Sequence, residues 1–172
     1  RSLLDISRID AGGITPEPAA IALSPFLSDL AETTRPMAEA KGLRLDVGPL
    51  PGMVESDAGL LRSVIQNFLS NAVKYTVEGK ILVEAGVRDN WLDISVEDSG
   101  IGMDDAGLAR LFQPFERIDS QLRVRTPGTG LGLYLTRKIA TELLSGSVDV
   151  TSNPGAGSRF TLHVPREGSG RA

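Results

Sequence analysis

Apolar positions along the 172-residue chain recur either with helical spacing or in strict alternation. Helical spacing predicts helices near residues 1–11, 24–41, 57–74 and 131–144, and a short helix that Asp104 caps and that ends at Leu111. Alternation and turn residues predict strands near 43–48, 52–56, 80–88, 91–98, 146–151 and 158–165. Because helices fall between groups of strands, the pattern favours an α+β fold. We expect a two-layer α/β sandwich, with a mixed, mainly antiparallel sheet of about five strands packed on three helices.

Composition narrows the chemistry that such a fold can carry. The chain has 41% hydrophobic and 23% charged residues, which is ordinary globular usage, and it contains no cysteine. The lack of cysteine excludes a disulfide scaffold, a thiolate zinc site and a cysteine nucleophile. With one histidine, His163, a histidine-rich metal centre or a Ser/His/Asp triad is hard to build. A net charge of −4 disfavours general nucleic-acid binding. No apolar run reaches the roughly 20 residues of a membrane-spanning helix, so we expect no direct membrane contact.

The helix predicted over 57–74 carries a polar stripe at the edge of its apolar face. Asn67, Asn71 and Lys74 are spaced so that they stack on adjacent helical turns. A carboxamide oxygen is a hard ligand suited to Mg²⁺, and a lysine ammonium suits phosphate. The stripe therefore indicates a polar binding site, with an ordinary solvated stripe as the alternative.

Asp98 ends the strand predicted over 91–98, in the same inward-facing row as Val96. A carboxylate that faces a core requires a partner, because its desolvation is costly. Gly100 and Gly102 follow directly, and glycines allow the backbone to approach a ligand closely. The amino group of a purine would satisfy Asp98. A strand-end aspartate that makes a turn with the next residues is the alternative.

The segment GTGLGL, residues 128–133, opens a predicted helix and exposes backbone N–H groups where an anion is favoured. A dinucleotide-binding fold requires a strand directly before such a motif, but residues 117–127 are polar and unlike a strand. The phosphate-binding loop GxxxxGK[ST] does not occur either. Residues 113–130 form a predicted loop long enough to be a functional lid.

The last predicted strand has two faces. Ser158 lies in the inward row with Phe160, whereas His163 points to the other side. We therefore interpret His163 as an ordinary sheet-surface histidine without a catalytic role.

The order of four motifs carries more information than any one of them. The motifs are NFLSNAVKYT (67–76), DSGIGM (98–103), LFQPFER (111–117) and GTGLGL (128–133). Together they resemble the N, G1, F and G2 boxes of the catalytic ATP-binding domain of sensor histidine kinases. LLDISRIDAG (3–12) also resembles the end of that family's dimerisation and phosphoacceptor domain, and GAGSRFTLHVP (155–165) resembles its closing strand. The resemblance implies the Bergerat fold of the GHKL superfamily, shared with gyrase, Hsp90 and MutL ATPases.

The resemblance also implies a division of the chain. Residues 1–12 would end the phosphoacceptor helix, 13–20 would form a linker, 21–165 would form the kinase domain, and 166–172 would be a disordered tail. The chain opens inside a predicted helix and without Met, so we expect a fragment of a larger protein.

ATP and Mg²⁺ are the ligands that the resemblance implies. Asp98 would accept from the adenine amino group, with Ser158 supporting a water network beside it. Asn71 would coordinate Mg²⁺ and Asn67 would lie near the reacting phosphate, which makes these two the expected catalytic residues. The other implied ATP-binding residues are Lys74, Tyr75, Gly100, Gly102, Phe115, Arg117, Gly128, Thr129, Gly130, Leu131 and Gly132, with Arg123 and Arg125 as further lid contacts.

Two departures from the family pattern shape the expected activity. No histidine matches the phosphoacceptor, which in the family lies on a helix upstream of this segment. Asn67 stands where gyrase-type relatives carry a glutamate base, and a carboxamide is a poor general base. The pattern therefore favours phosphoryl transfer to histidine over rapid ATP hydrolysis. A degenerate nucleotide-sensing module is the alternative, and a Bergerat ATPase or an anti-sigma-type serine kinase is a third reading.

The implied partners are the phosphoacceptor helix of the parent kinase and the receiver domain of a response regulator. We expect the fragment to be monomeric, the parent to be a homodimer, and the domain to be cytoplasmic even where the parent is anchored in a membrane. The linker, which contains Pro16 and Pro18, is expected to act as a hinge.

Overall fold

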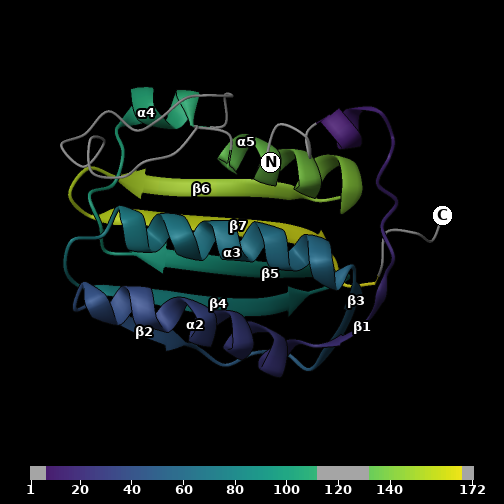
Figure 1. Ribbon diagram of the computed structural model, residues 1–172, viewed down its shortest axis with the longest axis horizontal. Helices are drawn as coiled ribbons and strands as arrows, with labels where there is room; N and C mark the ends of the chain where they lie inside the picture. The colour runs from purple at the N-terminus through teal and green to yellow at the C-terminus, as the bar shows by residue number, and fades with distance from the viewer. Residues whose placement is uncertain (1–6, 112–131, 168–172) are drawn as a thin grey trace.

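The computed structural model describes residues 7–111 and 132–167. Its elements are β1 (Ala19–Ala22), α2 (Leu23–Ala40), β2 (Arg44–Val47), β3 (Met53–Ser56), α3 (Ala58–Lys74), β4 (Lys80–Arg88), β5 (Trp91–Asp98), α4 (Asp105–Arg110), α5 (Gly132–Lys138), the π-helix η1 (Ile139–Leu143), β6 (Ser147–Asn153) and β7 (Gly157–Pro165). Residues 7–10 are helical as well. Figure 1 shows how these elements are arranged.

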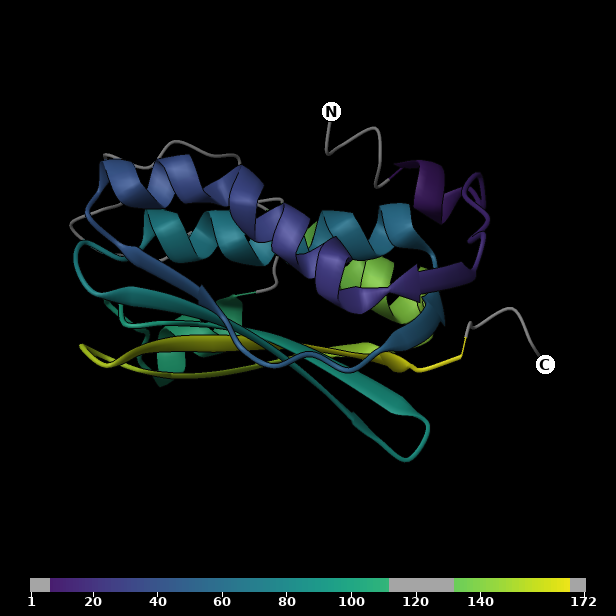
Figure 2. The ribbon, with the colours of Figure 1, turned by 90° about the horizontal axis from the view of Figure 1, so that it is seen from below.

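Five strands form one sheet in the order β2-β4-β5-β7-β6, and β1 pairs with β3 in a separate two-stranded sheet. The β2–β4 pair is parallel, and the other three pairs of the larger sheet are antiparallel. Helices α2, α3 and α5 lie on one face of this sheet, as Figure 2 shows. The expected two-layer sandwich with a mainly antiparallel sheet is confirmed.

Helix α3 is the central helix of that layer. Asp57 caps its first turn, because the carboxylate oxygen Oδ1 accepts from the Leu60 N–H at 3.0 Å. The apolar residues of α3 that face the sheet are fully or almost fully buried: Leu61, Val64, Ile65, Phe68, Leu69, Ala72 and Val73. The ring of Phe68 lies 5.4 Å from that of Phe160 on β7, measured between centroids. This packing fixes which side of α3 faces the end of β5.

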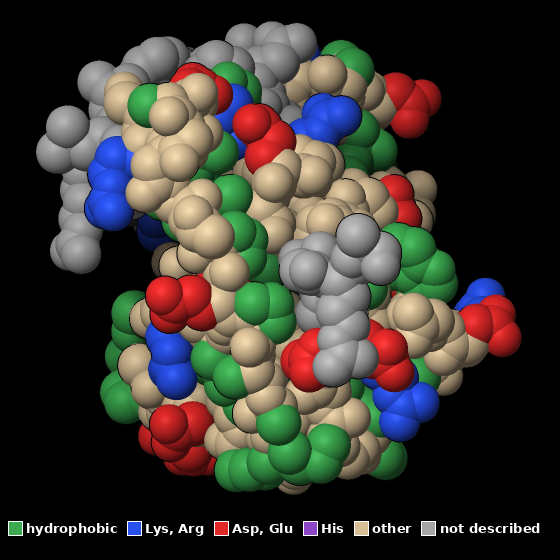
Figure 3. Space-filling model, turned by 90° about the vertical axis from the view of Figure 1, so that its right-hand side faces the viewer, with side chains coloured by type: hydrophobic (Ala, Val, Ile, Leu, Met, Phe, Trp, Pro, Cys, Tyr) green, Lys and Arg blue, Asp and Glu red, His purple; other side chains and the backbone are tan. Residues whose placement is uncertain are grey.

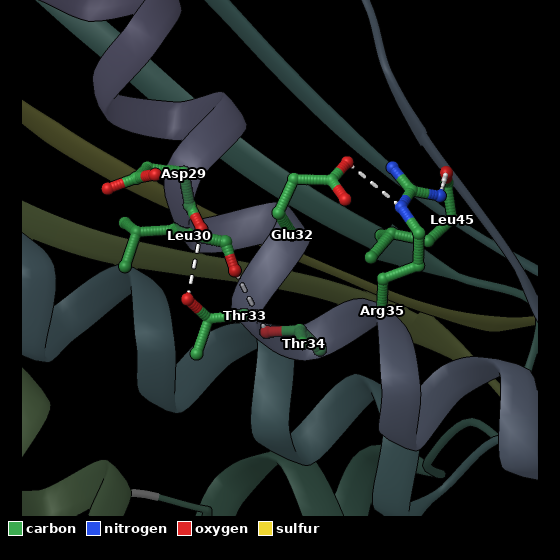
Figure 4. A network of polar contacts seen from close by, with 7 residues as sticks. All are labelled: Asp29, Leu30, Glu32, Thr33, Thr34, Arg35 and Leu45. Carbon is green, nitrogen blue, oxygen red and sulfur yellow. Dashed lines mark hydrogen bonds and ion pairs between the residues drawn. The ribbon is translucent and has the colours of Figure 1, made fainter.

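Helix α2 is fastened to the sheet beside its internal proline. Pro36 has no N–H to donate to the carbonyl one turn earlier. Next to it, Arg35 donates through Nη1 to the Leu45 carbonyl of β2 at 2.8 Å and through Nε to Glu32 at 3.0 Å (Figure 4). At the end of α2, the Lys41 ammonium donates to the Val73 carbonyl at 2.6 Å, which ties α2 to the C-terminal end of α3.

The predicted turns and caps are confirmed. Strands β4 and β5 form the expected hairpin, and Asp89 in its turn adopts a positive φ of 55°. Asp104 caps α4, because its Oδ1 accepts from the Gly107 N–H at 2.8 Å. The strands predicted near 146–151 and 158–165 are β6 and β7, which are antiparallel and are joined by a turn that contains Pro154.

Two element boundaries differ from the expectation. Ala19 and Ala20, expected in the linker, belong to β1 and pair with Ser56 and Glu55 of β3, a partner that is distant in sequence. The helix expected over 131–144 is α-helical to Lys138 and continues as the π-helix η1. In both cases the change depends on main-chain hydrogen bonds that apolar spacing does not report.

Arg166 was expected to begin a disordered tail, and for this residue the expectation is wrong. Its N–H donates to the Asn90 carbonyl at 2.8 Å, and its own carbonyl accepts from the Glu55 N–H at 2.8 Å. These bonds connect the end of β7 to the β4–β5 turn and to β3. A polar sequence does not reveal such a bridge, because the two partners come from elsewhere in the chain.

Among the described residues, no helix is both long enough and apolar enough to cross a membrane. Acidic and basic side chains are interspersed on the side of the molecule where β1 and β3 lie (Figure 3). This side therefore presents mixed charge, in keeping with a net charge of −4.

Candidate functional site

A cavity that opens to solvent lies between α3, α5 and the ends of β5 and β7, and about 320 Å³ of space, part of it open solvent, is bounded by its lining. The residues that line it are Asn71, Tyr75, Asp98, Ile101, Gly102, Met103, Leu133, Ser158 and Phe160. Five of them were expected site residues: Asn71, Tyr75, Asp98, Gly102 and Ser158. Segments that are far apart in the sequence therefore meet at one cavity.

Asp98 is the one carboxylate among the residues that line this cavity. It is 7% exposed, and its Oδ1 accepts from the Gly100 N–H at 2.9 Å and from the Ser158 N–H at 3.3 Å. Burial raises the pKa of Asp98 to about 6, against the lowering effect of these two hydrogen bonds. Both backbone bonds use the same carboxylate oxygen, Oδ1.

Thr76 is a polar residue at this site that our sequence reasoning missed. It is fully buried, and its hydroxyl lies beside Asp98, where a hydrogen bond to the carboxylate helps to lower the Asp98 pKa against the effect of burial. Its Oγ1 and Asp98 Oδ1 each lie 2.9 Å from the point where a Cβ on Gly100 would stand. The sequence did offer one indication that Thr76 belongs to the site, because Thr76 is the last residue of the first motif and directly follows Tyr75.

The three residues of the polar stripe of α3 have different surroundings. Asn71 lines the cavity, as does Tyr75, which follows the last residue of α3. Asn67, one turn earlier, is absent from the lining, and its Nδ2 donates to the Thr136 hydroxyl of α5 at 2.6 Å. Lys74 ends α3 and is half-buried, outside the lining residues. The stripe is therefore partly a binding surface and partly a contact between two helices.

The glycines after Asp98 allow a close approach within the chain itself. A Cβ on Gly100 would stand 2.3 Å from the Tyr75 carbonyl oxygen, and one on Gly102 would stand 1.9 Å from that of Asn153. Gly102 also has a positive φ of 68°. These glycines thus allow the loop after Asp98 to pack closely against the C-terminal end of α3 and the β6–β7 turn. Gly102 still lines the cavity, whereas Gly100 does not.

Ser158 belongs to a small hydrogen-bond network on the cavity wall. Its hydroxyl lies 2.8 Å from that of Ser152, which accepts from the Met103 N–H at 2.8 Å and donates to the Gly157 carbonyl at 3.0 Å. This network holds the loop after Asp98 to strands β6 and β7. Ser152 was missed because alternation alone does not show which serines meet.

The remaining expected site residues fall mostly in the segment between α4 and α5. Phe115, Arg117, Arg123, Arg125, Gly128, Thr129, Gly130 and Leu131 lie outside the described residues. Gly132 is the first residue of α5, and its neighbour Leu133 lines the cavity.

His163 lies away from this cavity, and its interpretation as a sheet-surface residue is confirmed. Its Nδ1 contacts Asp93 Oδ1 on β5, and its Nε2 lies 2.6 Å from Asp149 Oδ2 on β6. Burial lowers the pKa of His163, but the hydrogen bonds and charges of the two aspartates outweigh that effect and raise it. The three side chains form an ion-pair cluster across β5, β7 and β6.

Comparison with known proteins agrees with this site. A protein family described as "Histidine kinase-, DNA gyrase B-, and HSP90-like ATPase" matches residues 56–168, which include most of the helical layer and the whole cavity lining. The chain belongs to this ATPase family.

Relatives place the chain on the histidine kinase side of the ATPase family. It is 37% identical over 169 residues to the Non-motile and phage-resistance protein of Caulobacter vibrioides, covering 95% of this chain and 20% of that protein. It is 32% identical over 170 residues to Sensor histidine kinase RcsC of Escherichia coli, covering 97% of this chain and 18% of that protein. The chain thus spans about a fifth of the length of these relatives.

A solved structure extends the match to three dimensions. Full-length ShkA in complex with AMPPNP superimposes with a TM-score of 0.85 and 30% sequence identity, over 98% of this chain and 35% of that chain. Together with the relatives, this match identifies the chain as a catalytic, ATP-binding domain of the sensor histidine kinase type.

Proposed function

We propose that this domain binds Mg·ATP in the cavity and transfers the γ-phosphoryl group to a histidine elsewhere in the parent protein. The phosphoryl group would then pass to an aspartate of a response-regulator receiver domain. The observation that carries the proposal is the buried carboxylate of Asp98 on the wall of a cavity that Asn71 also lines.

The base of the nucleotide suits the inner part of the cavity. Ile101, Met103, Leu133 and Phe160 supply apolar surface for a flat ring, while Asp98 supplies one acceptor for an exocyclic amino group. The serine network beside Asp98 would hold water against the ring. One acceptor in an apolar slot would favour adenine over a base that presents a carbonyl at that position, because two acceptors would face each other.

The polar stripe of α3 suits the triphosphate of the nucleotide. Asn71 lines the cavity and has the oxygen donor that Mg²⁺ prefers, so it would hold the cation. Bound Mg²⁺ would neutralise charge on the triphosphate. Asn67 and Lys74 lie on the same stripe, and we propose that they act near the reacting phosphate and as a phosphate contact. Phosphoryl transfer is mainly positioning and charge neutralisation, so these residues need no covalent role.

Transfer to histidine is favoured over hydrolysis by the chemistry of Asn67. Activation of water requires a base, and among the described residues that line the cavity only Asp98 is acidic. Asp98 accepts from two backbone N–H groups, and in this proposal it faces the adenine ring rather than the phosphates. An imidazole is itself a nucleophile and requires positioning more than deprotonation.

The connection to the rest of the parent is the second part of the proposal. Residues 13–18 have no regular structure, and the Glu17 N–H donates at 2.8 Å to Asp57 Oδ2, whose other oxygen caps α3. A hinge between the phosphoacceptor helix and the domain would therefore pivot between Gly12 and Glu17. We propose a monomeric domain that acts within a homodimeric parent.

Calorimetric titration with a non-hydrolysable ATP analogue, with and without Mg²⁺, tests the nucleotide site. We expect the wild-type chain to bind, Asp98→Asn to abolish binding, and Asn71→Ala to remove the dependence on Mg²⁺. Asp93→Asn is the matched control, because it makes the same change on the same strand but on the opposite face of the sheet. Binding that survives Asp98→Asn, or that is lost equally in Asp93→Asn, would refute the assignment.

A further inference from the structure

The hydrogen bond between Asn67 and Thr136 joins the two helices that border the cavity. The donor is Nδ2 of Asn67, the acceptor is Oγ1 of Thr136, and the distance is 2.6 Å between residues 69 apart in sequence. Thr136 is 2% exposed. Asn71 and Leu133, one turn away on α3 and α5, line the cavity. The bond therefore lies directly behind the cavity wall.

Within the described residues, this contact decides which end of the Asn67 carboxamide is engaged. A carboxamide has a donor end and an acceptor end, and here the donor end is directed to Thr136. Threonine hydroxyls in helices commonly donate to the carbonyl four residues earlier, which leaves the oxygen to accept. Thr33, Thr34 and Thr141 of this chain do so, at 3.0, 3.1 and 2.9 Å. The Thr136 hydroxyl is accordingly suited to accept from Asn67.

We propose that Thr136 is a positioning residue, which holds the Asn67 carboxamide with its carbonyl oxygen free for the water shell of the bound cation. This inference rests on the proposed function, since it assumes that Mg·ATP binds beside α3. A free oxygen cannot accept from a phosphate oxygen, because both are acceptors. It can accept from cation-bound water, whose hydrogens are polarised. Thr136 would thereby select the partner of Asn67 without touching the ligand.

The simpler reading is that the bond merely joins α3 to α5. The two readings differ in what the loss of the Thr136 hydroxyl does. A purely structural bond would affect stability and every ligand alike. A positioning bond would affect the part of the affinity that depends on Mg²⁺ and would leave binding of the base unchanged.

Calorimetry on the full 172-residue chain separates the two readings, with adenosine as a base-only probe and the ATP analogue AMPPNP with and without Mg²⁺. Thr136→Val removes the hydroxyl at nearly constant volume, and Thr136→Ser keeps it. One neutral hydrogen bond corresponds to about a three- to tenfold change in affinity. We expect Thr136→Val to lose that factor for AMPPNP with Mg²⁺ only, and Thr136→Ser to match the wild type.

Two further variants, Asn67→Ala and the double variant Asn67→Ala/Thr136→Val, complete a double-mutant cycle. If Thr136 acts through Asn67, Asn67→Ala loses a similar factor, and adding Thr136→Val to it causes no further loss. Thr141→Val is the matched control, because it removes an exposed helical hydroxyl that donates to a carbonyl one turn earlier.

Three results would overturn the inference: wild-type affinity in Thr136→Val, an equal loss for adenosine, or additive losses in the double variant. In each of these three cases the proposed function would still hold, provided that the wild-type chain binds adenosine and AMPPNP. Failure of the wild-type chain to bind either probe would instead remove the proposed function and the inference together.

Discussion

Replacement of Asp98 by asparagine should stabilise the free protein at neutral pH while it abolishes nucleotide binding. Burial raises the pKa of the Asp98 carboxyl from its ordinary 3.8 to about 6, so folding favours the protonated form. Above that pH the ionised carboxylate destabilises the folded state. Asparagine keeps an acceptor oxygen for the Gly100 and Ser158 N–H groups and has no charge to desolvate.

The size of the effect follows from the two pKa values. The difference between 3.8 and about 6, at about 1.36 kcal/mol per pH unit, is at most roughly 3 kcal/mol. For a domain of this size, that corresponds to about 6–12 °C in the melting temperature. The protonated carboxyl stabilises fully below 3.8, and this stabilisation is lost as the pH rises through about 6. The gain in the free energy of unfolding from Asp98→Asn should therefore be absent in acid and complete at neutral pH.

Urea unfolding followed by circular dichroism, between about pH 3.5 and about pH 8, measures this difference. Asp29→Asn on α2 is the control, because it removes an exposed carboxylate by the same substitution. An Asp98→Asn protein less stable than wild type at neutral pH would refute the reasoning. A stabilisation of equal size at all pH values would also refute it, since desolvation of a charge must titrate.

Three further predictions concern pH and packing. AMPPNP affinity should fall as the pH is lowered through about 6, because protonation removes an acceptor oxygen of Asp98; titration calorimetry across that range checks it. The stability due to His163 should be complete below its ordinary pKa of 6.5 and be lost as the pH rises through its raised pKa, so His163→Gln should flatten that part of the urea-unfolding profile. Gly102→Ala should cost about 2 kcal/mol or more, because φ is 68° and the new Cβ would meet the Asn153 carbonyl oxygen at 1.9 Å. Gly86→Ala has no atom within 4 Å of its new Cβ and should change the free energy of unfolding by about 0.5 kcal/mol or less, measured in the same way.

Local patterns predicted the elements well where the periodicity was long. The apolar repeat of α3, the Asp104 cap of α4 and the pairing of β4 with β5 follow from side-chain spacing and turn chemistry, which are local properties. The same reasoning placed Asp98 in an inward row, and its burial agrees. It missed Thr76 and Ser152, because a lone hydroxyl has no sequence pattern that shows its neighbours.

The amino-acid sequence by itself determined the helices, the strands and the layer architecture, because these depend on spacing along one strand or one helix, while the expected ligand chemistry came from the resemblance that the order of the motifs carries. Only the tertiary structure decided that Asn71 lines the cavity while Asn67 bonds to Thr136. It likewise decided that Gly102 accommodates the Asn153 carbonyl. Such contacts join residues far apart in the chain, so they are set by how the layers pack against one another rather than by any local preference.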